Sequence, residues 1–152
     1  MNSKVQSDLK FGFKSEDESQ KYLEQIFGEL KNTRTDDKDQ YNKFDYRNDK
    51  CKIELKTRKC RFGQYPDLYF ELGKIKEGIK YKKENPDKKV FFIWRCVYTS
   101  WKEEGYYYWE LNEEEYNTGY GGRNDRGKDE YKILVKIKNE YIKPLFSHKP
   151  TL

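Results

Sequence analysis

The segment from Val90 to Tyr98, which reads VFFIWRCVY, constrains the fold of this chain more than any other. It is the most hydrophobic run in a sequence that is 39% charged and only 34% hydrophobic, so there are few such runs from which to build a core. A short apolar run without alternating polar positions is typical of a strand that is buried on both faces. We therefore expect this segment to be the central strand of a sheet that other elements cover on both sides.

Helical periodicity predicts two helices on the N-terminal side of this strand. The first is expected to start at a capping box formed by Ser15 and Glu18 and to run to about Leu30. The second should run from Leu72 to about Glu84 and is rich in lysine. It should end at the Asn-Pro-Asp sequence that follows, because proline cannot continue a helix.

Four further strands are expected from alternating or apolar segments. Two of them should form a hairpin around the turn signal Arg-Asn-Asp-Lys at residues 47–50. The predicted strands run from Tyr41 to Tyr46, Cys51 to Thr57, Tyr106 to Leu111 and Tyr131 to Ile137. The glycine- and charge-rich segment from Asn117 to Lys128 is expected to be a loop, and the tail after Ile142 receives no assignment.

The resulting element order, α-β-β-α-β-β-β, predicts a mixed α/β fold (α+β, mixed sheet) in which helices flank a central mixed β-sheet. With 152 residues and no internal repeat or linker, the chain is expected to be a single domain over residues 1–152. Its core should span about residues 12–111, and residues 112–152 should form a C-terminal extension of loop, strand and tail.

The net charge of +5 is unevenly distributed along the chain. Residues 43–102 contain 17 Lys and Arg residues against 8 Asp and Glu residues, a surplus of +9, so the remainder carries −4. A basic surplus of this kind is expected where a polyanion such as a nucleic-acid backbone binds, although solvated surface lysines would give the same count.

The composition disfavours several other classes of protein. The three cysteines (Cys51, Cys60 and Cys96) form no CxxC pair, and the single histidine, His148, lies near the end, so neither a disulfide framework nor a four-ligand zinc site is expected. No apolar run approaches the roughly 20 residues of a membrane span, and residues 1–10 lack a signal-peptide stretch. We expect a soluble intracellular protein, in the cytoplasm or the interior of a host cell.

The predicted hairpin brings together residue types suited to phosphodiester hydrolysis. Asp45 ends its first strand, while Glu54 and Lys56 share one face of its second strand. A divalent metal held by carboxylates can supply both an activated water and a counter-charge for the reacting phosphate, and an ammonium group can orient the water. In a chain this charged, the Glu-x-Lys sequence also has a plainer interpretation, a charge pair on a solvated sheet face.

The sequence Phe44-Asp45 followed by Ile53-Glu54-Leu55-Lys56 resembles the PD-(D/E)XK nuclease superfamily, which includes restriction endonucleases and Holliday-junction resolvases. The family pattern has an acidic residue at a strand end, then Glu or Asp, any residue and Lys on the next strand. The resemblance extends in element order over roughly residues 12–98. The proline of the family name is absent here, because Phe44 precedes Asp45.

This resemblance implies a restriction endonuclease-like core and a Mg2+-dependent DNA endonuclease, with Mn2+ able to substitute for Mg2+. It assigns metal binding to Asp45, Glu54 and the backbone carbonyl of Leu55, and the catalytic lysine role to Lys56. Relatives of this size often cut two strands as homodimers, so a homodimer is compatible with the resemblance.

The first helix of the family usually carries a further glutamate. The predicted helix opens with the sequence Gly12-Phe13-Lys14-Ser15-Glu16. A small residue, Ser19, and a leucine, Leu23, follow Glu16, as in the family. The resemblance gives Glu16 a supporting or metal-linked role. Glu18 is the alternative, but it has a competing capping role, so Glu16 is favoured.

Basic residues around the motif are expected to contact nucleic acid. Three follow the motif strand, where they would face a phosphate backbone, and one is chosen from the second helix because relatives often place a Lys or Gln there. Two more lie in the predicted glycine-rich loop, which is either a clamp over DNA or a long surface turn. The residues are Arg58, Lys59, Arg61, Lys74, Arg123 and Arg126. The alternative for each is that it is an ordinary surface residue exposed to solvent.

The leading hypothesis is a metal-dependent DNA endonuclease of resolvase, phage, viral or restriction type. The alternative is a non-catalytic basic nucleic-acid-binding module in which lysines hold phosphates and tyrosines such as Tyr65 and Tyr69 stack on bases. A third hypothesis is a protein-interaction domain whose charge serves only solubility. The endonuclease hypothesis requires the carboxyl groups of Asp45 and Glu54 to lie close enough to bind the same metal ion, with Lys56 beside them.

Overall fold

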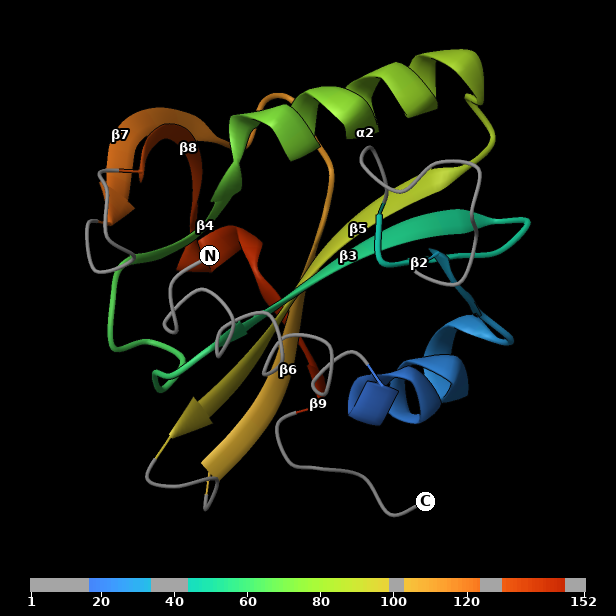
Figure 1. The fold of residues 1–152 in the computed structure, drawn as a ribbon, viewed down its shortest axis with the longest axis horizontal. Coiled ribbons are helices and arrows are strands. Elements are labelled where there is room, and N and C mark those ends of the chain that lie inside the picture. Colours follow the sequence, from blue (N-terminus) through green and yellow to red (C-terminus); the bar gives the residue numbers. More distant parts are fainter. Residues whose placement is uncertain (1–16, 34–43, 99–102, 124–129, 147–152) are drawn as a thin grey trace.

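The computed structural model describes residues 17–33, 44–98, 103–123 and 130–146 (Figure 1). Within these ranges the chain forms a main sheet of six strands, a second sheet of three strands and two α-helices. Ser15, Glu16, Arg126 and the first half of the strand predicted from Tyr41 to Tyr46 lie outside the described residues. No described helix is long and apolar enough to cross a membrane.

The main sheet is mixed and is built around two long parallel strands. Its order is β1-β2-β3-β5-β6-β9. β3 and β5 run parallel, and every other neighbouring pair is antiparallel. The strands are β1 (Lys31–Asn32), β2 (Tyr46–Arg47), β3 (Cys51–Arg58), β5 (Lys89–Tyr98), β6 (Glu103–Glu110) and β9 (Lys143–Phe146).

β5 contains the predicted central strand. It lies between β3 and β6, and its side chains are buried without interruption from Phe92 to Val97. Because successive strand residues point to opposite faces, this run shows that both faces of the sheet are covered. The prediction drawn from the hydrophobic run is confirmed.

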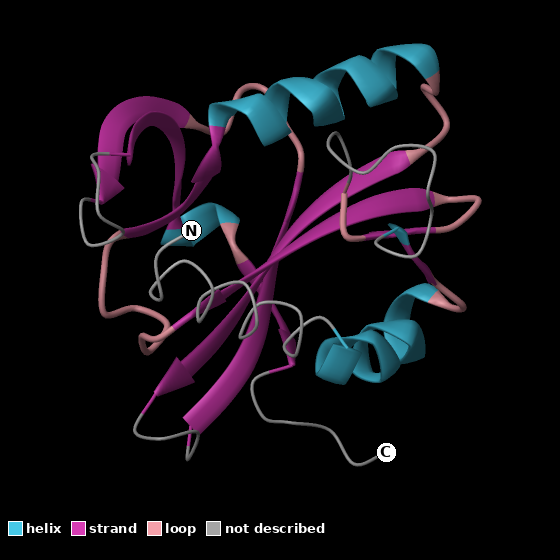
Figure 2. Ribbon diagram, in the orientation of Figure 1, coloured by secondary structure: helices cyan, strands magenta, loops and turns pink. Residues whose placement is uncertain are grey.

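Different elements cover the two faces of the main sheet (Figures 1 and 2). The helix at residues 17–27 packs Leu23 against Ile53 and Ile93 on one face. The helix α2 (Leu72–Glu84) and the second sheet cover the other face. The second sheet has the antiparallel order β4-β8-β7, formed by β4 (Asp67–Glu71), β8 (Glu130–Lys138) and β7 (Asn117–Arg123), and the short helix η2 (Asn139–Tyr141) follows β8.

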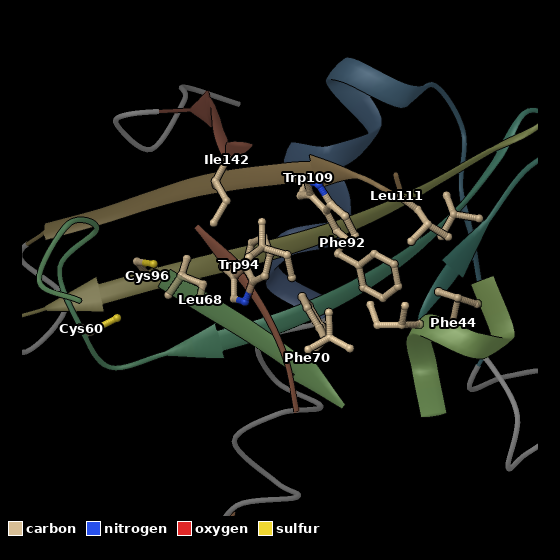
Figure 3. Close-up of a cluster of buried hydrophobic side chains, with 14 residues drawn as sticks. Phe44, Cys60, Leu68, Phe70, Phe92, Trp94, Cys96, Trp109, Leu111 and Ile142 are labelled. Atoms are coloured by element: carbon tan, nitrogen blue, oxygen red, sulfur yellow. The ribbon is translucent and has the colours of Figure 1, made fainter. Parts of the chain in front are cut away.

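Aromatic side chains fill the layer between the main sheet and the second sheet (Figure 3). The ring of Phe70 on β4 lies 4.8 Å from that of Phe92 and 4.9 Å from that of Trp94, both on β5. Trp109 on β6 lies 5.7 Å from Phe92. Tilted ring pairs at these distances add favourable contacts to the apolar area that they bury. They fix β4, and hence the start of α2, over the main sheet.

Two predicted elements are confirmed closely. The hairpin exists, with Tyr46 opposite Ile53 in an antiparallel pair, and α2 begins and ends at the predicted residues. The first helix ends earlier than expected, at residue 27 instead of Leu30. The cause is Gly28, whose φ of 81° is the left-handed conformation that commonly ends a helix.

The predicted element order is incomplete. The segment from Asn117 was expected to be a loop, but Asn117–Arg123 is the strand β7, which pairs along its length with β8. The strands β1, β4 and β9 were also not predicted. The sequence of β7, NTGYGGR, has no hydrophobic period, so backbone pairing to β8 and not burial of an apolar face defines it as a strand.

Candidate active site

Asp45 and Glu54 meet where the β2–β3 hairpin opens. Tyr46 pairs with Ile53, which places Asp45 and Glu54 opposite each other one position further along the ladder. Here the carboxylate of Asp45 accepts a hydrogen bond from the backbone N–H of Leu55 at 2.8 Å. This bond takes the place of a backbone-to-backbone hydrogen bond between the two strands. The carbonyl of Asp45 accepts a further bond from the N–H of Thr33 at 3.0 Å. Asp45 is therefore held through both its side chain and its backbone.

Glu54 is buried between the main sheet and α2. Its exposed fraction is only 7%, and its carboxylate lies 3.2 Å from the ammonium group of Lys74. Lys74 is in the first turn of α2, which follows β4 with no intervening loop, so the second sheet positions this lysine over β3. The side chain of Lys74 is 29% exposed and can therefore also face solvent.

The environment of Glu54 raises its pKa well above the usual range for a glutamate. Burial is the largest cause, and the charge of Asp45 and a hydrogen bond to the Asp45 carboxyl act in the same direction. Lys74 opposes the shift through its charge and its hydrogen bond, but does not cancel it. The net effect favours the protonated form of Glu54 more than in an exposed glutamate.

The Asp45–Glu54 pair fits a divalent cation that prefers oxygen ligands. Two carboxyl groups close enough to share a hydrogen bond are close enough to bind one cation, whose charge would offset the repulsion between them. The N–H of Leu55 is directed to Asp45, and in a strand the C=O of the same residue is directed to the same side. Within the described residues, no group of three or more His, Cys, Asp or Glu side chains is arranged to hold a metal ion.

Lys56 lies two residues after Glu54 on β3, on the face of the sheet that α2 covers. Its side chain is half-buried. The structure therefore brings Asp45, Glu54 and Lys74 into contact and places Lys56 on the same strand face as Glu54. Glu16, the predicted helix carboxylate, lies outside the described residues.

Glu18, the alternative helix carboxylate, lies on the other face of the main sheet. Its carboxylate lies 3.0 Å from the guanidinium of Arg95, which also pairs with Glu104. This network was not predicted, although a signal for it was present. An arginine inside the most hydrophobic strand needs carboxylate partners, because an unpaired buried charge is costly.

The predicted nucleic-acid-binding residues have different environments. Arg58 lies over the ring of Tyr69 at 4.3 Å, and Arg61 lies over the ring of Tyr98 at 4.7 Å. Lys59 is exposed beside them. Arg123 ends β7, so it belongs to a paired strand and not to the predicted loop, and Arg126 lies outside the described residues.

A family model described as "Phage putative PDDEXK endonuclease" matches residues 7–142, which include every site residue discussed above. No curated protein and no solved structure matches the chain.

Proposed function

The chain belongs to the phage PDDEXK endonuclease family, and on this premise we propose that it is a metal-dependent endonuclease that hydrolyses phosphodiester bonds in DNA at Asp45, Glu54 and Lys56. The observation that carries the proposal is the contact between the carboxyl groups of Asp45 and Glu54, at a position where burial and then the charge of Asp45 raise the pKa of Glu54. Structural ion pairs rarely bring two like charges together, whereas active sites often do.

The metal would be held by the carboxylates of Asp45 and Glu54 and by the backbone carbonyl of Leu55. Glu16 is proposed as a further ligand or supporting group on the basis of the family pattern. Mg2+ is the proposed ion, because it prefers oxygen ligands and retains several waters. When bound, such an ion activates a water as the nucleophile and neutralises charge on the reacting phosphate.

The two lysines have separate proposed roles. Lys56 shares the strand face of Glu54, so its ammonium group would orient the attacking water or contact the reacting phosphate. Lys74 holds the Glu54 carboxylate from the side of α2 at 3.2 Å, and its partial exposure allows it to contact a bound phosphate as well.

The test is cleavage of plasmid DNA, and of a duplex that carries a single-stranded flap, by the purified protein with Mg2+, Mn2+ or EDTA. We expect the protein to cut in either metal and to be inactive in EDTA. Glu54→Gln and Lys56→Ala should each reduce the rate by about 100-fold or more, because each removes a group from the reacting centre.

Two matched controls lie in the turn of the same hairpin. Asp49 and Lys50 are exposed, so Asp49→Asn and Lys50→Ala change the same charges without touching the site and should cut at the parent rate. If the parent protein binds DNA but cuts in no metal, the chain is instead a non-catalytic binding module and the proposal is wrong.

A further inference from the structure

A tight turn follows β3 and holds its side chains in fixed positions. The N–H of Gln64 donates to the carbonyl of Arg61 at 3.0 Å, and the side chain of Gln64 accepts from the N–H of Arg61 at 3.1 Å. Gly63 has a φ of 92°, which the third position of a type II turn requires. Phe62 anchors the turn by stacking on Tyr107 of β6, with ring centroids 4.1 Å apart and an interplanar angle of 10°.

The turn presents aromatic rings to solvent beside a cation. Tyr65 is 54% exposed, and its carbonyl accepts a hydrogen bond from the side chain of Asn139 at 2.6 Å. Tyr98, at the end of β5, is 37% exposed and lies against the guanidinium of Arg61. We call residues 61–65 together with Tyr98 the aromatic turn. The exposed rings are those of Tyr65 and Tyr98. Their backbone is held in place by the hydrogen bond from Asn139 to Tyr65 and by the pairing of Tyr98 in β5 with β6.

Arg58 lies between the aromatic turn and the candidate active site. It shares a face of β3 with Glu54 and Lys56, and four residues of strand place it about 13 Å along from Glu54. Its Nε and Nη2 atoms are shielded from solvent and have no hydrogen-bond partner among the described residues. Buried donors without a partner are costly, so an acceptor contributed by a ligand would be favourable here.

We propose that the aromatic turn stacks on unpaired bases of a single-stranded DNA segment, whose phosphates follow Lys56, Arg58 and Arg61 to the active site. The inference rests on the proposed function and specifies its substrate class: DNA with a single-stranded segment, such as a flap, a gap or an open branch.

The chemistry of the turn favours a single strand over a duplex. Exposed aromatic rings beside arginines form the usual platform for single-stranded nucleic acid, because every base has a face on which a ring can stack. In a duplex those faces are covered by neighbouring bases, so a tyrosine reaches them only after unstacking. A single-stranded segment also needs only one cut, so this substrate does not require a homodimer.

The test is fluorescence anisotropy with a labelled single-stranded oligonucleotide and with its duplex, both in EDTA so that no cleavage occurs. The parent protein should bind the single strand more tightly. Tyr65→Ala should weaken single-strand binding about tenfold, as expected for the loss of one stacked base, and duplex binding by less than about twofold. Tyr65→Trp, which keeps a stacking ring, should restore single-strand binding.

Ile26→Ala is the matched control. Ile26 is 51% exposed, close to the exposure of Tyr65, but it lies on the helix that covers the opposite face of the main sheet. This variant should bind both probes as the parent does. A single strand that carries 5-iodouracil should crosslink under light to Tyr65 or Tyr98, which mass spectrometry of the peptides would identify.

The inference is overturned if Tyr65→Ala and Tyr98→Ala bind the single strand as Ile26→Ala does, or if the crosslinks map elsewhere, for example to β7 and β8. Because binding is measured without metal, its outcome is independent of catalysis. A protein that cuts DNA but shows no role for Tyr65 would retain the proposed function and lose this inference. A protein whose single-strand binding depends on Tyr65 but that cuts no DNA would retain this inference and lose the proposed function.

Discussion

Both faces of the main sheet bury charged side chains, but the two faces balance these charges differently. On the side of the N-terminal helix, Arg95 is 1% exposed and lies between the carboxylates of Glu18 and Glu104. On the side of α2, the carboxyl groups of Asp45 and Glu54 contact each other, with Lys74 beside them. One face surrounds a cation with carboxylates, and the other brings two carboxyl groups together beside a single lysine.

The difference separates a structural network from a candidate reactive one. A buried arginine between two carboxylates has its charge matched by neighbours and needs no additional ligand. On the other face, burial and the neighbouring charge of Asp45 raise the pKa of Glu54. An added cation would stabilise this pair of carboxyl groups, which is a property expected of a metal site. The comparison therefore predicts that substitutions on the first face affect stability, and that those on the second affect metal binding and catalysis.

The largest expected effect on stability is at Arg95. Arg95→Ala leaves Glu104, whose side chain is 7% exposed, as a buried carboxylate without its cation, and should lower the free energy of unfolding by about 3–5 kcal/mol. Urea denaturation followed by circular dichroism would measure the loss. The control is Lys89→Ala, because Lys89 and Glu110 form an exposed pair at 3.7 Å and should contribute less than about 1 kcal/mol. Equal losses in the two variants would contradict the structural role of Arg95.

A smaller effect, which depends on pH, is expected at Glu54. Its folded-state pKa is raised, so ionising Glu54 costs more in the folded chain than in the unfolded chain. The metal-free protein should therefore lose stability as the pH rises from the ordinary glutamate pKa of about 4.3 to the raised value, by about 1.4 kcal/mol for each pH unit between them. Glu54→Gln, which cannot ionise, should not show this loss.

Unfolding free energies of the parent protein and Glu54→Gln in EDTA would measure this difference. The two should be alike in acid, and the variant should become the more stable of the two as the pH rises towards neutrality. Asp49→Asn, in the exposed turn of the same hairpin, should follow the parent. A variant that is less stable than the parent at neutral pH would show that an ionised Glu54 is paired in the metal-free fold, contrary to the account.

The parts of the fold that were predicted correctly are those with a strong hydrophobic pattern. The run around Ile93 predicted the central strand, and the amphipathic lysine-rich segment before Asn85 predicted α2. β4 was missed although its buried Leu68 and Phe70 alternate with less buried neighbours, because five residues give a weak signal. β7 has no such pattern and depends on pairing with β8, a contact that composition does not show.

The approach of Asp45 to Glu54 could be predicted from the sequence, but the charges and the burial around the two residues could not. Spacing indicated Asp45, Glu54 and Lys56, because a hairpin determines which residues lie opposite each other. The raised pKa of Glu54 depends on burial under α2 and on contact with Asp45. The partners of Arg95 lie 77 and 9 residues away along the chain, so the first of them could be known only from the packing of the N-terminal helix.

The central claim, that Asp45 and Glu54 together bind a divalent cation, is tested most directly by calorimetric titration with Mg2+ near neutral pH, repeated in buffers of different ionisation enthalpy. The parent protein should bind one ion with release of protons, because carboxyl groups bind a metal in their ionised form and burial beside Asp45 raises the pKa of Glu54. Asp45→Asn should lose this binding, and Asp49→Asn should retain it. Absence of binding by the parent, or equal binding by Asp45→Asn, would contradict the account.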